Sequence, residues 1–80
     1  MRKLTSAELA EAARLGRSVA SASRDIDRAR DQLDNAVRAQ VDQTSPRWDQ
    51  LCDNLEGAIR KHSLRAEEER AWWEAHGFKV

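Results

Sequence analysis

The sequence contains few of the residues that build disulfide-stabilised or membrane-spanning proteins. Its 80 residues include one cysteine, one proline, three glycines and no tyrosine. The single cysteine, Cys52, excludes an internal disulfide framework and a zinc site made of several cysteines. No apolar run approaches the roughly 20 residues of a membrane span, and residues 1–5 lack the apolar core of a secretory signal. We therefore expect a cytoplasmic protein that does not enter a membrane.

The balance of charge and apolar bulk favours a small helical domain that needs a second chain. The 14 Lys and Arg residues balance the 14 Asp and Glu residues, and charged residues make up 35% of the chain. Thirteen of the hydrophobic residues are alanine, so only 18 side chains have enough bulk to fill a core. β-branched and aromatic residues are too few to favour a sheet. A chain of this size buries too little apolar surface to offset the entropy of ordering it. We therefore expect a homodimer, the alternative being a hetero-complex in which a different protein covers the apolar stripe.

The first predicted helix spans about residues 6–42. It begins at a capping box, Thr5-Ser6-Ala7-Glu8, in which the Thr5 hydroxyl and the Glu8 carboxylate each bind the other residue's backbone N–H. An apolar heptad repeat follows, with small alanines that let a partner helix approach closely. Its two sets of positions are Ala12, Val19, Ile26 and Leu33, and Leu15, Ala22, Ala29 and Ala36.

Residues 43–45 are the predicted turn, because they precede the only proline of the chain. Ser45 is a suitable N-cap and Pro46 a suitable first helical residue, so the second helix is predicted over about residues 46–76. Gly77 is then placed to end it in a left-handed conformation. A second apolar stripe beginning near Leu64 leaves two alternatives open. Either one long helix contacts two surfaces, or Ser63 caps a separate short third helix.

A connection this short between two long helices predicts an all-α antiparallel hairpin that forms one domain over residues 1–80. Counting outward from the turn places Leu33 opposite Leu55, and Leu15 opposite Trp73. Two such hairpins would pair their apolar stripes into a four-helix bundle. The residues predicted to form the core and the dimer contact are Val19, Ile26, Leu33, Trp48, Leu55, Ile59 and Trp73.

The candidates for chemistry do not combine into a catalytic or metal site. Cys52 lies on the apolar stripe of the second helix, about 15 Å along the helix from His62, and is interpreted as a small buried side chain. His62 and His76 are fourteen residues apart, whereas helical metal ligands are three or four apart. Residues 67–69 are three glutamates that point in three directions. We therefore expect no enzymatic activity, no catalytic residue, no metal and no cofactor.

An arginine-rich face on the first helix is the first candidate for partner binding. Four arginines fall on the side opposite the apolar heptad, and Arg2 and Lys3 add charge at the same end. Such a face can dock an acidic protein or the phosphates of a nucleic acid. The zero net charge argues against nucleic acid as the main partner. The four residues are Arg14, Arg17, Arg24 and Arg28.

The C-terminal aromatic residues are the second candidate. Trp73 continues the apolar stripe and is predicted to pack in the core, whereas Trp72 lies about 100° away around the helix. Trp72, Phe78 and Leu64 are therefore predicted to contact another chain, because tryptophan is enriched in binding hot spots.

These observations predict a small non-enzymatic protein-binding module. Its size and neutral charge suit a homodimeric helical inhibitor or adaptor that acts on a larger partner protein. The alternative is a nucleic-acid-associated accessory protein that uses the four arginines. Arginine outnumbers lysine 11 to 3, and this bias, with the abundant alanine, favours a bacterial or phage origin.

Overall fold

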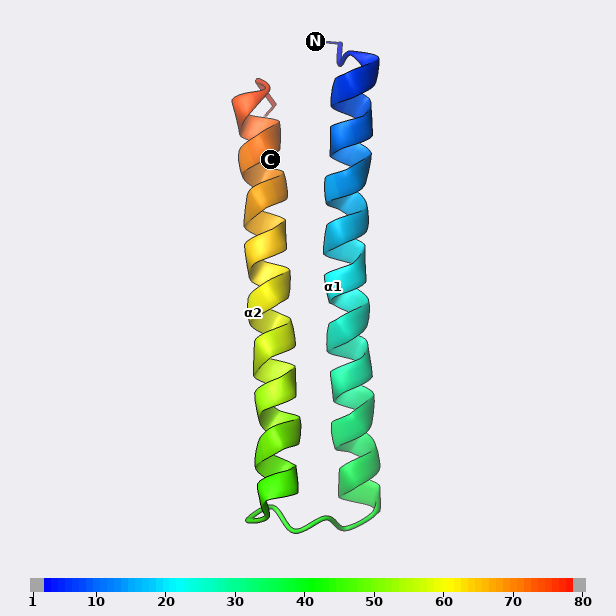
Figure 1. The fold of residues 1–80 in the computed structure, drawn as a ribbon, viewed down its shortest axis with the longest axis vertical. Coiled ribbons are helices and arrows are strands. Elements are labelled where there is room, and N and C mark those ends of the chain that lie inside the picture. Colours follow the sequence, from blue (N-terminus) through cyan, green and yellow to red (C-terminus); the bar gives the residue numbers. More distant parts are fainter. Residues whose placement is uncertain (1–2, 79–80) are drawn as a thin grey trace.

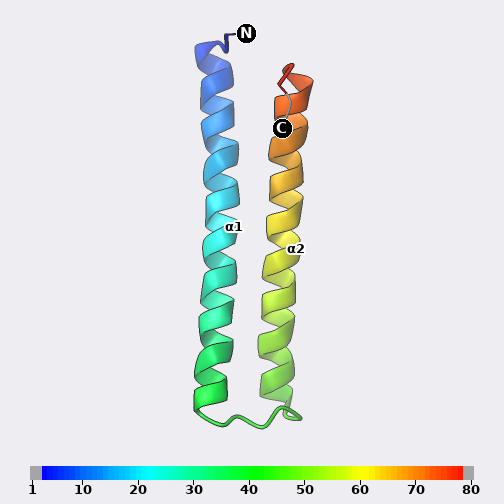
Figure 2. The same cartoon turned by 180° about the vertical axis from the view of Figure 1, so that it is seen from behind.

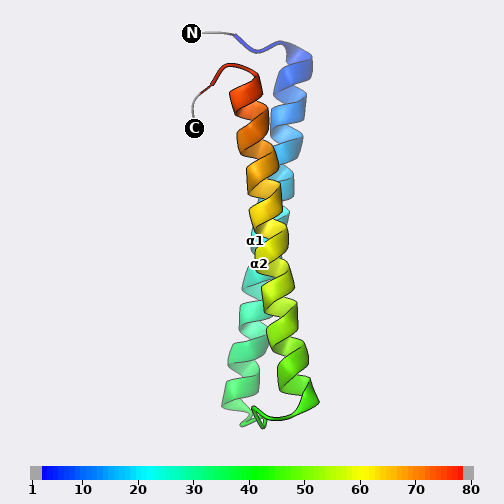
Figure 3. The ribbon, with the colours of Figure 1, turned by 90° about the vertical axis from the view of Figure 1, so that its left-hand side faces the viewer.

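The chain forms two long antiparallel helices joined by one loop (Figure 1). The computed structural model describes residues 3–78, and no strand occurs within that range. Helix α1 spans Ser6–Arg38 and helix α2 spans Pro46–Ala75. The hairpin measures 54 × 16 × 16 Å. The helices lie side by side along their whole length in the views of Figures 1 and 2, and Figure 3 shows the two chain ends together, opposite the loop. The predicted all-α hairpin is confirmed at this level.

The predicted capping box starts α1. The Thr5 N–H donates to Glu8 Oε1 at 2.9 Å, and the Glu8 N–H donates to Thr5 Oγ1 at 3.1 Å. Both side chains therefore satisfy backbone donors that have no partner within the helix. A capping box uses only residues three apart in sequence, which explains why the sequence alone locates this end correctly.

Helix α1 ends at Arg38, four residues before the predicted end at 42. Gln40 adopts a left-handed conformation with φ 57°. The Gln40 N–H donates to the Val37 carbonyl at 3.0 Å, and the Val41 N–H donates to the Ala36 carbonyl at 2.9 Å. These two bonds form a Schellman motif, which usually carries glycine at the position of Gln40. The predicted boundary was wrong because glutamine gives no sequence signal for this conformation.

A turn held by Asp42 explains why the chain leaves the helix here. The Asp42 carboxylate accepts hydrogen bonds from the Thr44 N–H at 2.9 Å and the Thr44 hydroxyl at 2.7 Å. The Ser45 hydroxyl donates to the Asp42 carbonyl at 2.6 Å. Short polar side chains of this kind compete with a helix for backbone groups. The loop therefore spans residues 39–45, and not 43–45 as predicted.

Helix α2 is one continuous helix, which decides between the two alternatives at Ser63. Ser45 caps its start by accepting from the Trp48 N–H at 3.3 Å, with Pro46 as the first helical residue. Its end at Ala75 is followed by Gly77 with φ 88°, as predicted. The Phe78 N–H donates to the Trp73 carbonyl at 2.9 Å, and the two rings meet edge to face at 5.3 Å. No third helix occurs within residues 3–78.

The interior of the hairpin is a single column of one leucine and three alanines on α1, the interhelical seam. The buried residues among 3–78 are Leu15, Ala22, Ala29 and Ala36. Their spacing of seven confirms the heptad, and the alanines let α2 approach closely. Within the described residues α2 has no buried side chain. Of the predicted core residues, Ile59 is 46% exposed and the others are half-buried: Val19, Ile26, Leu33, Trp48, Leu55 and Trp73.

The longer loop changes the register between the helices. The Lys61 ammonium lies 3.5 Å from the Asp25 carboxylate, where the predicted register placed residue 63 opposite Asp25. His76 lies 3.4 Å from Glu8, where the predicted register placed residue 80. Contacts of α2 are therefore displaced by two to four residues at these points. The displacement follows from the end of α1, because the centre of the loop moves from residue 44 to residue 42.

The turn makes a prediction about pH. Hydrogen bonds from the Thr44 backbone N–H and then from the Thr44 hydroxyl hold the pKa of Asp42 below its ordinary value of 3.8. Because the folded pKa is the lower one, the contribution to stability is complete above pH 3.8 and is lost as the pH falls through the folded pKa. An NMR titration of the Asp42 carboxyl carbon should give a midpoint below 3.8, and Thr44→Val should raise it. A folded-state midpoint at or above the value measured in urea would contradict this account.

Candidate interaction surfaces

The residues that flank the interhelical seam separate into an apolar and a polar side. Successive residues of a helix are rotated by about 100° about its axis. A residue four positions after a seam residue therefore lies on one side of the seam, and a residue three positions after it lies on the other side. The first side of α1 carries Val19, Ile26 and Leu33, and the second carries Ser18, Asp25 and Gln32. One step further round on the apolar side lies a border column of residues seven apart. It consists of Leu9, Gly16, Ser23, Arg30 and Val37.

Helix α2 can be divided by the same geometry around its half-buried residues Trp48, Leu55, His62 and Glu69. Its first side carries Cys52, Ile59, Ala66 and Trp73. Its second side carries Leu51, Ala58, Arg65 and Trp72, and is itself largely apolar. The border column of α2 on the first side is Asp49, Glu56, Ser63 and Arg70.

Two contacts show that the second sides of the two helices lie together. Lys61 reaches Asp25 at 3.5 Å, and the Trp72 indole N–H donates to Glu11 Oε2 at 2.8 Å. The opposite sides must then also lie together, and they form one apolar face of the hairpin. This apolar face consists of Ala12, Val19, Ile26 and Leu33 of α1 and Cys52, Ile59, Ala66 and Trp73 of α2.

The most exposed large apolar residues mark the same face. Among residues 3–78, the exposed ones are Leu9 and Val37, each 56% exposed, Ile59 at 46% and Leu64 at 56%. Leu9 and Val37 belong to the border column of α1, and Ile59 lies on the apolar face. Only Leu64 lies elsewhere among these described residues, on the outer side of α2. The other three exposed side chains make this face of the hairpin a candidate interaction surface.

The chain ends of the hairpin hold a cluster of aromatic rings, which corrects one expectation. Trp72 was expected on a side that α1 does not cover, yet its indole binds Glu11 of α1. Its ring also stacks on His76, with centroids 3.9 Å apart, and meets Trp73 edge to face at 5.0 Å. Trp72 lies three residues after Glu69, on the second side of α2, and this side faces the side of α1 that carries Glu11. Trp72 therefore contributes to the contact between the helices.

His76 joins the two helices at the same end. Its Nδ1 lies 2.7 Å from the Trp72 carbonyl oxygen, and its Nε2 lies 3.4 Å from Glu8 Oε2. Both ring nitrogens thus face oxygen atoms, and the doubly protonated ring can donate to both. Phe78, predicted to bind a partner, is half-buried and packs on Trp73 as part of the helix end.

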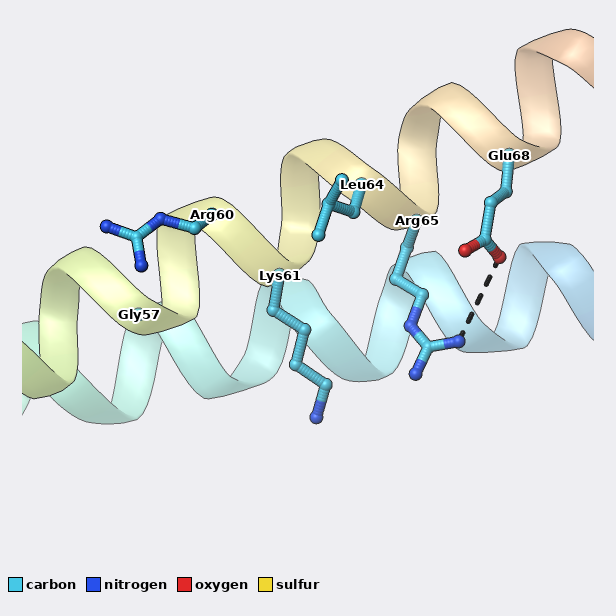
Figure 4. A pocket seen from close by; sticks show the side chains of 6 residues that line it. All are labelled: Gly57, Arg60, Lys61, Leu64, Arg65 and Glu68. Carbon is cyan, nitrogen blue, oxygen red and sulfur yellow. Dashed lines mark ion pairs between the residues drawn. The ribbon is translucent and has the colours of Figure 1, made fainter.

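A shallow pocket of about 340 Å³ lies on the outer side of α2, around Leu64 (Figure 4). Gly57 leaves open space beside it, since a Cβ there would meet no atom within 4 Å. Three cationic side chains line the pocket, and Arg65 also pairs with Glu68 at 3.9 Å. The sequence analysis identified Leu64 but missed these cations, whose spacing around Gly57 was the available signal. They are Arg60, Lys61 and Arg65.

The arginine-rich face of α1 is exposed as expected. Its residues are Arg14, Arg17, Arg24 and Arg28. Arg28 lies 3.8 Å from Asp25, which also binds Lys61, so its charge is partly compensated within the hairpin. Lys3 is exposed too, and Arg2 lies outside the described residues.

The residues considered for metal or thiol chemistry stay apart. Within residues 3–78, no three His, Cys, Asp or Glu side chains are grouped to hold a metal ion. Cys52 is a free thiol, half-buried on the apolar face. None of the helices in this range is both long and apolar enough to cross a bilayer.

The Trp72 contacts predict a stabilising role that can be measured. Trp72→Ala removes the hydrogen bond to Glu11 and the stacking on His76, and should lower the free energy of unfolding by about 1–3 kcal/mol. Trp72→Phe keeps a ring and should lose only about 1 kcal/mol. Urea denaturation followed by circular dichroism, at one protein concentration, measures both. The loss in Trp72→Phe should vanish in a Glu11→Ala background, and an undiminished loss there would refute the contact.

Comparisons of this chain with protein-family models, with curated protein sequences and with solved structures gave no match. The arguments for its function therefore come from the surfaces of the hairpin itself. Those surfaces are the apolar face, the pocket at Leu64 and the arginine-rich face of α1.

Proposed function

We propose that this protein is a non-enzymatic binding module that works as a homodimer. One observation carries the proposal: in residues 3–78 the buried side chains are one leucine and three alanines, while the larger apolar side chains reach solvent. Full burial of a valine, leucine or isoleucine stabilises by roughly 1.5–3 kcal/mol. Along the apolar face Ile59 is 46% exposed and the other large side chains are half-buried, so a surface that covers the face would add to this stabilisation.

A second hairpin is the occupant that suits this face. The apolar face runs along both helices, so its natural complement is a surface of the same length and width. Two hairpins placed face to face form a four-helix bundle whose centre is filled from all four helices. The alanines of the interhelical seam then hold each hairpin together, and Val19, Ile26, Leu33, Ile59 and Trp73 fill the bundle.

Two substitutions with matched exposure test the dimer. Val37 and Leu64 are each 56% exposed, but Val37 borders the apolar face and Leu64 does not. Val37→Glu should raise the dimer dissociation constant by about tenfold or more, because it brings a carboxylate into an apolar contact. Leu64→Glu should leave the constant unchanged. Sedimentation equilibrium measures both.

The oligomeric state of the wild-type chain is measured before that of the variants. It should sediment at twice the 9.1 kDa of one chain at micromolar concentration. A folded 9.1 kDa monomer would refute the homodimer.

The pocket at Leu64 is the surface we propose for a larger partner protein. It faces away from the apolar face and remains accessible in the dimer. Arg60, Lys61, Arg65 and Glu68 surround the exposed Leu64, and Lys61 and Arg65 already pair with Asp25 and Glu68. Arg60 is the cation of the pocket that has no ion pair within the described residues, so the pocket suits an apolar side chain next to a carboxylate. A dimer presents this pocket twice, as suits an inhibitor or adaptor of bacterial or phage origin.

The alternative function is nucleic-acid association through the arginine-rich face. The exposure of Arg14, Arg17, Arg24 and Arg28 favours it. The zero net charge of the chain and the pairing of Arg28 with Asp25 weaken the attraction to phosphates.

Capture experiments with the wild type and two variants, all immobilised, separate the two functions. The wild type, Leu64→Glu and a variant with all four arginines changed to Gln are used to capture partners from the native host. A protein captured by the wild type is then purified and its affinity for each variant measured. We expect Leu64→Glu to weaken binding about tenfold or more and the arginine variant to bind normally. Salt-sensitive capture of nucleic acid that is lost only in the arginine variant would favour the alternative.

A further inference from the structure

We infer that the second copy docks antiparallel on the apolar face, about a twofold axis perpendicular to the helices at the level of Ser23 and Ser63. This inference rests on the homodimer proposed above and specifies its geometry. In the resulting bundle, α1 lies against α1 of the second copy and α2 against α2. The loops of the two hairpins lie at opposite ends.

The border column of α1 is self-complementary about Ser23. Under a perpendicular twofold axis, residues at equal distances on either side of the centre meet their counterparts in the second copy. With Ser23 at the centre, Leu9 meets Val37 of the second copy. These are the two side chains of the column that are 56% exposed. The same symmetry places Gly16 opposite Arg30 of the second copy, at a point where the Glu69 carboxylate also approaches Gly16.

The border column of α2 is self-complementary about Ser63. Glu56 and Arg70 lie seven residues before and after it, so each meets the opposite charge on the second copy. Both side chains are exposed, and within the described residues neither forms an ion pair inside the hairpin. The dimer would therefore contain two symmetric Glu56–Arg70 pairs between copies.

The two centres coincide in space, although each follows from a different helix. Asp25 lies two residues after Ser23, and Lys61 lies two residues before Ser63. The ion pair between Asp25 and Lys61, at 3.5 Å, is the contact nearest to the two serines and places Ser23 and Ser63 at about the same level, although the His76–Glu8 contact at the chain ends corresponds to a register two residues different. One axis can then pass both centres at once, as an exact twofold dimer requires.

The packing of the bundle centre also favours this axis. By the same register, Trp73 lies within one residue of the level of Ala12, and Cys52 lies within one residue of the level of Leu33. In the antiparallel dimer each Trp73 lies in a layer with Ala12 of its own chain and with Leu33 and Cys52 of the second copy. The two tryptophans are then in different layers, so the side-chain volume is distributed evenly along the bundle. The other twofold arrangement, with both loops at one end, would place the two Trp73 side chains in one layer. It would also set Val37 against Asp49.

Cysteine cross-linking tests the axis directly, because a residue on a twofold axis meets itself. In a Cys52→Ala background, Ser23→Cys and Ser63→Cys should each form a disulfide between copies under mild oxidation. Ser21→Cys and Asn54→Cys are matched controls, since both positions are exposed but lie on other sides of their helices. They should remain uncrosslinked, and light scattering should show that every variant is dimeric when reduced.

The outcomes separate the inference from the homodimer. If neither single variant cross-links and only the double variant Ser23→Cys/Ser63→Cys does so, the dimer stands and the proposed axis is refuted. A monomer under reducing conditions refutes both.

Exchange of the paired charges gives a second measurement without cysteines. Glu56→Arg alone and Arg70→Glu alone should each raise the dimer dissociation constant about three- to tenfold. The double exchange should restore the wild-type constant. Failure of this restoration would contradict the pairing.

Discussion

Close packing of α2 against the alanines of α1 is the contact on which the rest of this structure depends. Ala22, Ala29 and Ala36 bring no bulk, so the helices approach closely and stay side by side along their length. The same contact buries little apolar surface. On α1 the larger apolar side chains Val19, Ile26 and Leu33 lie to one side of the interhelical seam, and together with Ile59 and Trp73 of α2 they form the apolar face. The alanines of the interhelical seam therefore account both for the close contact between the helices and for the incomplete core of the hairpin.

The sequence predicts those parts of the fold that depend on neighbouring residues. The capping box at Thr5, the Ser45-Pro46 start, the left-handed Gly77 and the heptad spacing are all local patterns, and the structure confirms them. The end of α1 depends on Gln40 adopting a conformation that glutamine seldom takes. That one residue sets the length of the loop, and the loop sets the register.

The candidate surfaces depend on the register, so they were only partly predictable. Periodicity identifies the residues of an apolar stripe, but not the level along the other helix that each of them faces. The Trp72–Glu11 and Lys61–Asp25 contacts supply that information. They show that Trp72 binds α1. The exposure of Leu64 and of the four arginines could be predicted without knowing the register, because residues opposite an apolar stripe face solvent in any register of the two helices.

An interior that lies on one helix makes the two helices unequal in the substitutions that they can accept. Ala22, which is 1% exposed, has no space for a larger side chain unless the helices separate. Helix α2 meets this column with half-buried side chains that can move aside toward solvent. Sequence drift during evolution would therefore be restricted most strongly at every seventh residue of α1. Most positions of α2 would be free to change with the molecules that the hairpin meets.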